Sequence, residues 1–490
     1  MTILSCKPPD TLPRYVKSNP ENLDENNADE IIKVTLELRE NLSEPVTFLY
    51  QESALLYDTL VLLFSLIQML QRIKFNLYLK SAKYNNSDRH YKHGLCYHNG
   101  RGTTKNEKSA FVWYLKSAEG GNSDGQYSLG FCYENGIGTS KNEKKAFEWY
   151  LRSAEGGNSN GQFNLGKCYT NGIGTNKDEK KAFEWYLKSA EGGNSDGQYS
   201  LGFCYENGIG TSKNEKKAFE WYLRSAEGGN SNGQFNLGKC YTNGIGTEKD
   251  EKKAFVWYLK SAKGDNFDGQ CSLGLCYIKG LGYCYENDIG TAKDEKKAFE
   301  WYLKSAESGN SGGHGNSNGQ SNLGWCYQNG IGTTKDEKKA FEWYLKSAES
   351  GNSNGQDNLG WCYQYGIGTD KNEKKAFEWY LRSAEGGNSN GQFNLGKCYT
   401  NGIGTVKNEM KAFAWYLKSA EGGNSNGQKK LVWCYLNGIG TYKDEKKAKK
   451  KAFERNLKSA EGGDSNGQYS LGWYYHYGIG TTKDGNKAFE

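Results

Sequence analysis

The chain has 490 residues and a formal net charge of +6, from 63 Lys and Arg against 57 Asp and Glu. Glycine supplies 64 residues, about twice its usual share of roughly 7%, and aromatic residues make up 14%, which excludes a disordered polar chain. Lys and Glu are interleaved, so the sequence lacks the clustered basic face of a nucleic-acid-binding protein, and we expect no nucleic-acid partner.

The N-terminal segment differs from the rest of the chain, because it contains no glycine before Gly94 and no tryptophan. Residues 1–30 are typical of a flexible tail, and residues 31–74 hold leucine-rich helical patterns that we expect to cap the rest of the fold. The segment Ala54 to Leu70 is apolar, but its uninterrupted run is shorter than the 18 or more residues of a spanning helix. We therefore predict a buried helix, with a membrane segment as the alternative, and a cytoplasmic protein without a secretory signal.

Residues 75–490 repeat a unit of 36 residues, for example Gly121 to Gly156. Its Leu-Gly pair recurs at Leu129, Leu165, Leu201, Leu237, Leu273, Leu323, Leu359 and Leu395. A period of this length predicts a solenoid rather than separate domains. We count about eleven units, the last of which is truncated inside its second helix.

Each unit is expected to form two helices. The first begins near Ser123 and Asp124, which are good N-cap residues, and ends at Gly136. The second begins after Asn142 and ends near Gly156. Because two such helices cannot bury their apolar faces alone, the units must stack. The predicted fold class is all-α, an α/α right-handed superhelical solenoid of helix-turn-helix repeats.

One cysteine recurs at the same place in each unit, at Cys96, Cys132, Cys168, Cys204, Cys240, Cys326, Cys362, Cys398 and Cys434. Equivalent positions on packed helices lie about 8–10 Å apart, which is too far for a disulfide. We therefore predict buried free thiols, as in a reducing compartment. Four cysteines are placed outside this register, with no assigned role: Cys6, Cys271, Cys276 and Cys284.

The pattern LGxCYxNGIGTxxxxxKKAFEWYLKSAEGG resembles the Sel-1-like repeat, a relative of the tetratricopeptide repeat. The match runs through the Leu-Gly pair, the loop glycines and the Trp-Tyr pair of each unit, although Gly125 stands where the family usually has alanine. The resemblance implies a scaffold that assembles protein complexes, such as signalling complexes, degradation machinery at the endoplasmic reticulum or activated cell-wall synthases. We also expect a eukaryotic, fungal source.

No catalytic motif accompanies the repeats, so we predict a protein without enzymatic activity, cofactor, bound metal or small-molecule substrate. The Gly136-Ile-Gly138 loop lacks the lysine of a phosphate-binding loop. His90, His93, Cys96 and His98 form the one dense cluster of potential zinc ligands. The alternative is a degenerate first unit in which His93 takes the leucine position.

The first helix of each unit carries its informative variation two residues after the leucine, about 200° around the helix. Aromatic residues and lysines alternate at this position, and both types occur at interface hot spots. The candidate partner-binding residues are Tyr127, two residues before its leucine, and, two residues after the leucine, Phe131, Lys167, Phe203, Lys239, Trp325, Trp361, Lys397, Trp433 and Trp473. The alternative is that these rings pack against the adjacent unit.

Together these observations predict a non-enzymatic scaffold or adaptor that binds other proteins on the concave surface of a helical solenoid. The alternative function is a regulatory or activator subunit of a single enzyme.

Overall fold

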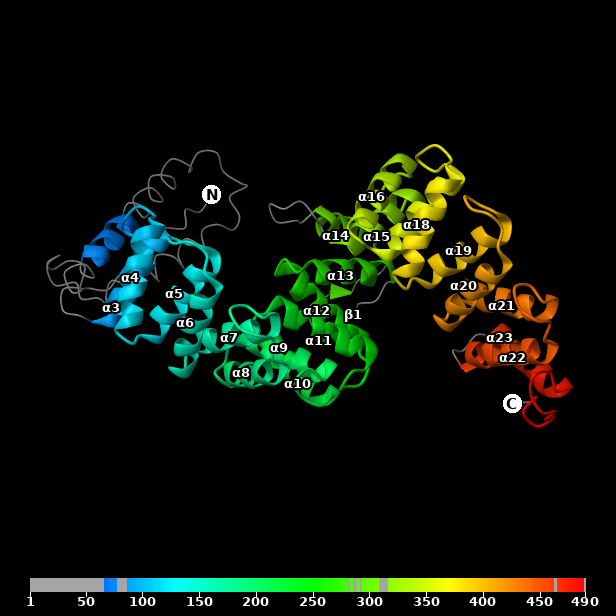
Figure 1. Ribbon diagram of the computed structural model, residues 1–490, viewed down its shortest axis with the longest axis horizontal. Helices are drawn as coiled ribbons and strands as arrows, with labels where there is room; N and C mark the ends of the chain where they lie inside the picture. The colour runs from blue at the N-terminus through cyan, green and yellow to red at the C-terminus, as the bar shows by residue number, and fades with distance from the viewer. Residues whose placement is uncertain are drawn as a thin grey trace, which may run out of the picture. The chain divides into compact units, whose positions relative to one another are not determined.

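The computed structural model describes residues 66–76, 86–279, 283–284, 289–290, 293–307, 316–461 and 465–488 (Figure 1). Chain contacts divide it into two compact units, residues 1–228 and 229–490. The predicted tail, residues 31–65 of the predicted cap and residues 54–65 of the apolar segment lie outside the described residues.

Within each of these two compact units the chain forms a series of helical hairpins. In each hairpin an odd-numbered first helix is followed by an even-numbered second helix. Residues 1–228 contain α3 (Ser87–Asn99), α4 (Glu107–Glu119), α5 (Ser123–Asn135), α6 (Glu143–Glu155), α7 (Ser159–Asn171), α8 (Glu179–Glu191), α9 (Ser195–Asn207) and α10 (Glu215–Glu227).

Residues 229–490 continue the same alternation. They contain α11 (Ser231–Asn243), α12 (Glu251–Lys263), α13 (Phe267–Lys279), α14 (Glu295–Glu307), α15 (Ser317–Asn329), α16 (Glu337–Glu349), α17 (Ser353–Tyr365), α18 (Glu373–Glu385), α19 (Ser389–Asn401), α20 (Glu409–Glu421), α21 (Ser425–Asn437), α22 (Glu445–Glu461) and α23 (Ser465–Tyr477). The predicted helix-turn-helix repeat is confirmed. One departure from an all-helical chain is the two-residue antiparallel pair β1 (Tyr283–Cys284) and β2 (Ile289–Gly290), inserted between α13 and α14.

Side-chain caps fix where the helices begin. The predicted cap of the first helix is wrong by one residue, because Asn122 is the N-cap and its Oδ1 accepts a hydrogen bond from the Gly125 N–H at 2.8 Å. Asn142 caps the second helix as predicted, accepting from the Lys145 N–H at 3.0 Å. Gly136 closes the first helix in the left-handed conformation, at φ 73°, where glycine avoids the strain of a side chain.

The core of each hairpin lies between its two helices. Leu129 and Ala146 are fully buried, and a Cβ added to Gly130 would lie 2.7 Å from the Tyr150 ring, so this glycine permits the close approach of the helices. Trp149 is half-buried, and the Arg152 guanidinium lies over its ring, 4.5 Å from the ring centroid. The tyrosine therefore takes the inner place beside the glycine.

The cysteines from Cys96 to Cys276 and from Cys326 to Cys434 are free, as predicted, and those of the repeat register are buried. Burial raises the pKa of the Cys132 thiol to about 12, so it acts as a small apolar group rather than as a nucleophile. The placement of Cys276 outside the repeat register is wrong. This residue occupies the buried cysteine position of α13, on the same helix as the buried Leu273 and Gly274.

Two contacts stack each hairpin on the preceding one. A Cβ on Gly138 would lie 2.7 Å from the carbonyl carbon of Glu107, at the start of the preceding second helix. The N-cap residue Asn158 donates from Nδ2 to Asp124 Oδ1 of the preceding first helix at 2.7 Å. Equivalent bonds recur within both units, for example from Asn194 and from Asn388, so the N-caps link successive repeats.

Residues 66–76 take the place of a second helix before α3. Gly102 approaches the Gln71 carbonyl carbon and Phe75 Cβ as Gly138 approaches Glu107 and Phe111. Ile67 and Leu70 are buried. Among the described residues, no helix is long and apolar enough to cross a membrane.

The histidine cluster belongs to this first hairpin. His93 occupies the leucine position, fully buried, stacked on Phe75 at 4.7 Å between ring centroids and edge-on to Trp113 at 4.4 Å. Neither of its ring nitrogens has a hydrogen-bond partner among the described residues. Burial, with smaller contributions from His90 and Lys116, lowers the pKa of His93 to about 4. No group of three or more possible metal ligands occurs where the structure describes the chain.

We expect His93→Leu to stabilise the first hairpin at acidic pH. The pKa of the His93 imidazole in the folded state lies below its unfolded value of about 6.5. The stability that the buried, neutral ring contributes is therefore fully present above pH 6.5 and is lost as the pH falls towards 4. Hydrogen exchange of the α3 and α4 amides measures the free energy of opening of this hairpin. In the wild type that free energy should fall by up to about 3 kcal/mol as the pH is lowered from 6.5 to 4. The protection should stay level in the variant. His476→Leu, at an exposed histidine of α23, is the control, and a pH dependence unchanged in His93→Leu would contradict the assignment.

Candidate functional site

Several of the predicted partner-binding side chains lie exposed on the first helices. The exposed fractions are 38% for Phe131, 43% for Phe203, 39% for Trp325, 38% for Trp433 and 49% for Trp473. Each of these side chains therefore keeps a part of its surface accessible to solvent, and its role in binding a partner stays a prediction.

The remaining predicted residues are held by their neighbours. Lys167, Lys239 and Lys397 each lie over the phenylalanine four residues earlier, at 5.8 to 5.9 Å from the ring centroid. Tyr127 is half-buried and lies 6.1 Å from the Tyr150 ring. Trp361 is half-buried and packs against two core clusters, so the packing alternative describes this tryptophan better.

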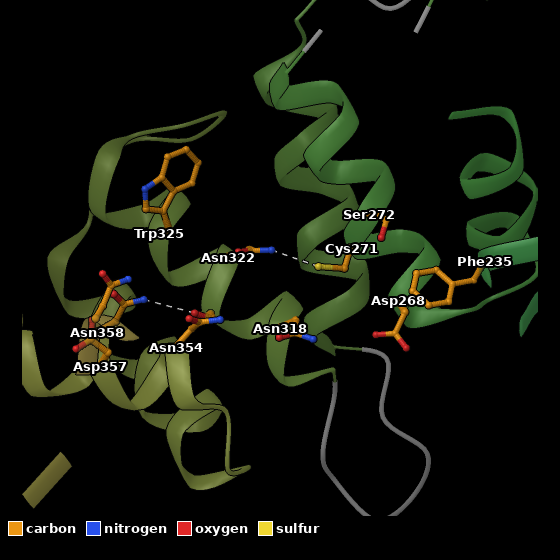
Figure 2. Close-up of a pocket in the computed structure, with 12 residues that line it drawn as sticks. Phe235, Asp268, Cys271, Ser272, Asn318, Asn322, Trp325, Asn354, Asp357 and Asn358 are labelled. Atoms are coloured by element: carbon orange, nitrogen blue, oxygen red, sulfur yellow. Dashed lines mark hydrogen bonds between the residues drawn. The ribbon is translucent and has the colours of Figure 1, made fainter. Parts of the chain in front are cut away.

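A groove of about 440 Å³ opens on the first-helix face of residues 229–490 (Figure 2). Counted from the first residue of each first helix, its lining comes from positions 2, 5, 6 and 9, which share one helix face. Position 2 supplies Asp268, Asn318, Asn354 and Asn390; position 5 supplies Phe235, Cys271, Ser321 and Asp357; position 6 supplies Ser272, Asn322 and Asn358; and position 9 supplies Trp325. The groove thus crosses successive repeats.

The groove exists because three successive repeats lack an aromatic residue at position 5. In the flanking repeats this residue is aromatic and lies about 6 Å from the buried tyrosine of the same hairpin, as in Phe235 with Tyr258 and Phe393 with Tyr416. In α13, α15 and α17 the position holds Cys271, Ser321 and Asp357. These smaller side chains leave open the volume that a ring would fill.

Hydrogen bonds join the lining side chains across the repeats. Asn322 donates from Nδ2 to Cys271 Sγ at 3.2 Å, and burial raises the pKa of that thiol to about 12. Asn318 and Asn354 accept through Oδ1 from the N-cap asparagines of the following repeats, at 2.7 and 2.6 Å. Figure 2 shows these amides following one another along the groove.

Asp357 is the unusual group of the groove. Its Oδ1 accepts a hydrogen bond from Asn394 Nδ2 at 2.9 Å. Burial raises the pKa of its carboxyl group to about 6, against the opposing effects of that hydrogen bond and of Lys397. A carboxylate placed where ionisation is costly is a common mark of a functional position.

Among the predicted partner-binding residues, Trp325 is the one that lines the groove. The sequence alone did not point to its polar partners, because the prediction followed the variation between repeats only at position 9 and named a single residue, Tyr127, at position 5. The signal was present at position 5, where the repeated Tyr or Phe gives way to Cys271, Ser321 and Asp357.

The repeats of this chain match a known family model along nearly their whole length. The Sel1 repeat model matches residues 90–122, 123–158, 159–194, 195–230, 231–266, 268–310, 317–352, 353–388, 389–424, 427–450 and 465–490. The chain belongs to the Sel1 repeat family. The resemblance noted in the sequence is therefore confirmed.

Solved structures place this Sel1 repeat protein beside bacterial ones. It is 34% identical to a protective antigen present in uropathogenic Escherichia coli strains that displays an SLR fold, over 85% of each chain and with a TM-score of 0.54. It is 31% identical to a Sel1 repeat protein from Oxalobacter formigenes, over 46% of this chain and 90% of that one, with a TM-score of 0.43. No curated protein matches the chain.

The similarity to the Escherichia coli antigen gives no support to a eukaryotic, fungal source or to a role in signalling. Sel1 repeat proteins are generally protein-interaction scaffolds. The family is typically non-enzymatic.

Proposed function

We propose that this Sel1 repeat protein is a non-enzymatic scaffold that binds partner proteins on the face formed by its first helices. The observation that carries the proposal is the exposed tryptophans on the first helices of residues 229–490, with Trp325 at a groove lined by side-chain amides and carboxylates. Aromatic anchors beside polar groups are the usual composition of a protein interface. A regulatory subunit of one enzyme would use the same face.

The proposal includes no cofactor and no small-molecule substrate. It also includes a cytoplasmic location, which the chemistry of the cysteines supports. The buried free thiols, such as Cys326 and Cys362, have their pKa raised to about 12 and serve as packing groups, which suits a reducing compartment.

We expect the double variant Trp325→Ala, Trp433→Ala to lose bound proteins while its helix content stays unchanged. Both rings are more than a third exposed, so we expect the helical hairpins to remain folded although the packing of the covered part of each ring is lost. The measurement is affinity enrichment from a lysate of the source cells, with circular dichroism as the check on folding. Many unrelated partners favour a scaffold, and one stoichiometric enzyme favours a regulatory subunit.

Tyr442→Ala is the matched control, because this ring is 93% exposed but lies in the loop between α21 and α22. It should retain the wild-type partners. Equal enrichment by the wild type and the tryptophan variant would show that the first-helix face is not the binding surface.

A further inference from the structure

We propose that the groove of residues 229–490 binds an extended polypeptide segment that carries a lysine or arginine. The backbone of the segment pairs with the asparagines at position 2, and its cation faces Asp357. This inference rests on the proposed scaffold function and names the chemistry of its partner. Four features of the groove support it: its hydrogen-bonding capacity, its spacing, its charge and Trp325.

The asparagine row, defined as Asn318, Asn354 and Asn390, offers side-chain N–H groups as hydrogen-bond donors. Each Oδ1 accepts from the N-cap asparagine of the following repeat, at 2.6 to 2.7 Å. Each Nδ2 makes no hydrogen bond among the residues that the structure describes, and all three residues are exposed. An amide that already accepts through its oxygen offers N–H donors, which suit peptide carbonyl groups.

The spacing of the row suits an extended chain. Its members lie on α15, α17 and α19, and neighbouring first helices contact one another. Packed helices lie about 8–10 Å apart, and an extended polypeptide advances about 3.3 Å per residue. One repeat therefore spans about three peptide residues, so every third carbonyl can meet an asparagine of the row.

The charge of the groove selects a cationic segment. Asp268 and Asp357 line it, and no lysine or arginine does, although the chain as a whole has a net charge of +6. Lys397 and Tyr380 are the charged or titratable groups that act on Asp357 from the adjacent helices. Burial outweighs Lys397, because the pKa of Asp357 is raised despite it, so a ligand cation would supply compensation that the fold does not.

Trp325 provides an apolar surface on the same face, four residues beyond Ser321 on α15. An exposed indole can pack against the aliphatic stem of a lysine or the plane of an arginine. Tryptophan with amides and carboxylates also suits a saccharide. The two carboxylates without a lining cation favour the basic peptide, because a neutral saccharide gives them no counter-charge.

The test uses the full-length protein and a positional-scanning array of nonapeptides at pH 7.5. We expect selection of lysine or arginine at one position and weak preference elsewhere. Asp357→Asn should weaken binding of the selected peptide about tenfold or more, as loss of a charged pair predicts. Wild-type binding should also weaken as the pH falls from 7.5 to 5, because Asp357, with its pKa of about 6, becomes protonated.

The chain offers a matched pair for the asparagine row. Asn354→Ala and Asn160→Ala remove the same type of N-cap link, to Asn388 at 2.6 Å and to Asn194 at 2.8 Å. Of the two, Asn354 lines the groove. Asn354→Ala should therefore reduce peptide binding, while Asn160→Ala should leave it at the wild-type level with a similar change in stability.

Four outcomes would overturn the inference. They are no peptide bound, no preference for a basic residue, a neutral oligosaccharide bound on a parallel glycan array in place of peptides, and unchanged peptide binding by Asp357→Asn. The scaffold proposal is tested separately. If the tryptophan variant loses its partners but Asp357→Asn and Asn354→Ala keep them, the scaffold stands and the groove inference fails.

Discussion

Gly368→Ala should markedly destabilise the stacked repeats of residues 229–490. Gly368 adopts φ +66°, and an added Cβ would lie 2.8 Å from the carbonyl carbon of Glu337 and 2.9 Å from Phe341 Cβ. Those atoms belong to α16 of the preceding hairpin, so the methyl group must push the adjacent repeats away from each other. Left-handed strain of about 1–2 kcal/mol and an overpacking cost of about 1–3 kcal/mol add together.

Gly366→Ala separates the two costs. Gly366 also has a left-handed φ, +71°, but its added Cβ would meet its nearest atoms at an ordinary 3.5 Å. Thermal or urea unfolding followed by circular dichroism should show a small loss for Gly366→Ala and a loss about twofold or more larger for Gly368→Ala. Equal losses would mean that close contact between repeats does not limit this position.

Asp357→Asn should stabilise the protein at neutral pH. The folded carboxyl group has its pKa raised from 3.8 to about 6 by burial, so the folded state holds a proton more tightly than the unfolded state. Stability therefore falls as the pH rises from about 4 through 6, and the ionised form costs about 2–3 kcal/mol above that range. An amide has the same shape without the charge, and its oxygen can still accept from Asn394.

Unfolding of the wild type and the variant between pH 4 and pH 8 measures this cost. The two proteins should be nearly equal at pH 4 and diverge as the pH rises, with the variant more stable. Asp268→Asn is the control, because that side chain lines the same groove but is exposed. A variant less stable than the wild type at pH 7.5 would contradict the electrostatic assignment.

Asp357→Asn is also expected to weaken binding of a basic peptide. The change in stability and the change in affinity together show whether Asp357 has a functional role. A side chain that lowers stability and raises affinity is retained for function. If Asp357→Asn changed stability alone, Asp357 would be a tolerated irregularity of the repeat.

Much of the hairpin could be predicted from local sequence. The helix ends at Gly136 and Asn142, the burial of Leu129 and the close contact at Gly130 all follow from caps and helical spacing. The N-cap Asn122 was missed by one residue, because Ser123 and Asp124 are themselves good capping residues and local preference does not distinguish adjacent candidates.

The groove could be predicted only to a limited extent. Three of its lining residues, Cys271, Ser321 and Asp357, stand in the sequence as successive departures from an aromatic residue that most of the other repeats carry. Their consequence depends on where the missing rings would have lain, about 6 Å from the buried tyrosines. The effect on each tryptophan was equally non-local, since Trp325 is exposed and Trp361 packs against its neighbours although both occupy position 9.

The sequence by itself determined the repeat, its two helices and its family, because these depend on caps, glycines and apolar spacing within about 36 residues. The tertiary structure decided which outward side chains meet across repeats and which volume stays open. The raised pKa of Asp357 and the hydrogen bonds from each N-cap asparagine to position 2 of the preceding first helix arise from atoms of adjacent hairpins. Burial and contact of that kind depend on stacking, which the pattern of a single unit does not encode.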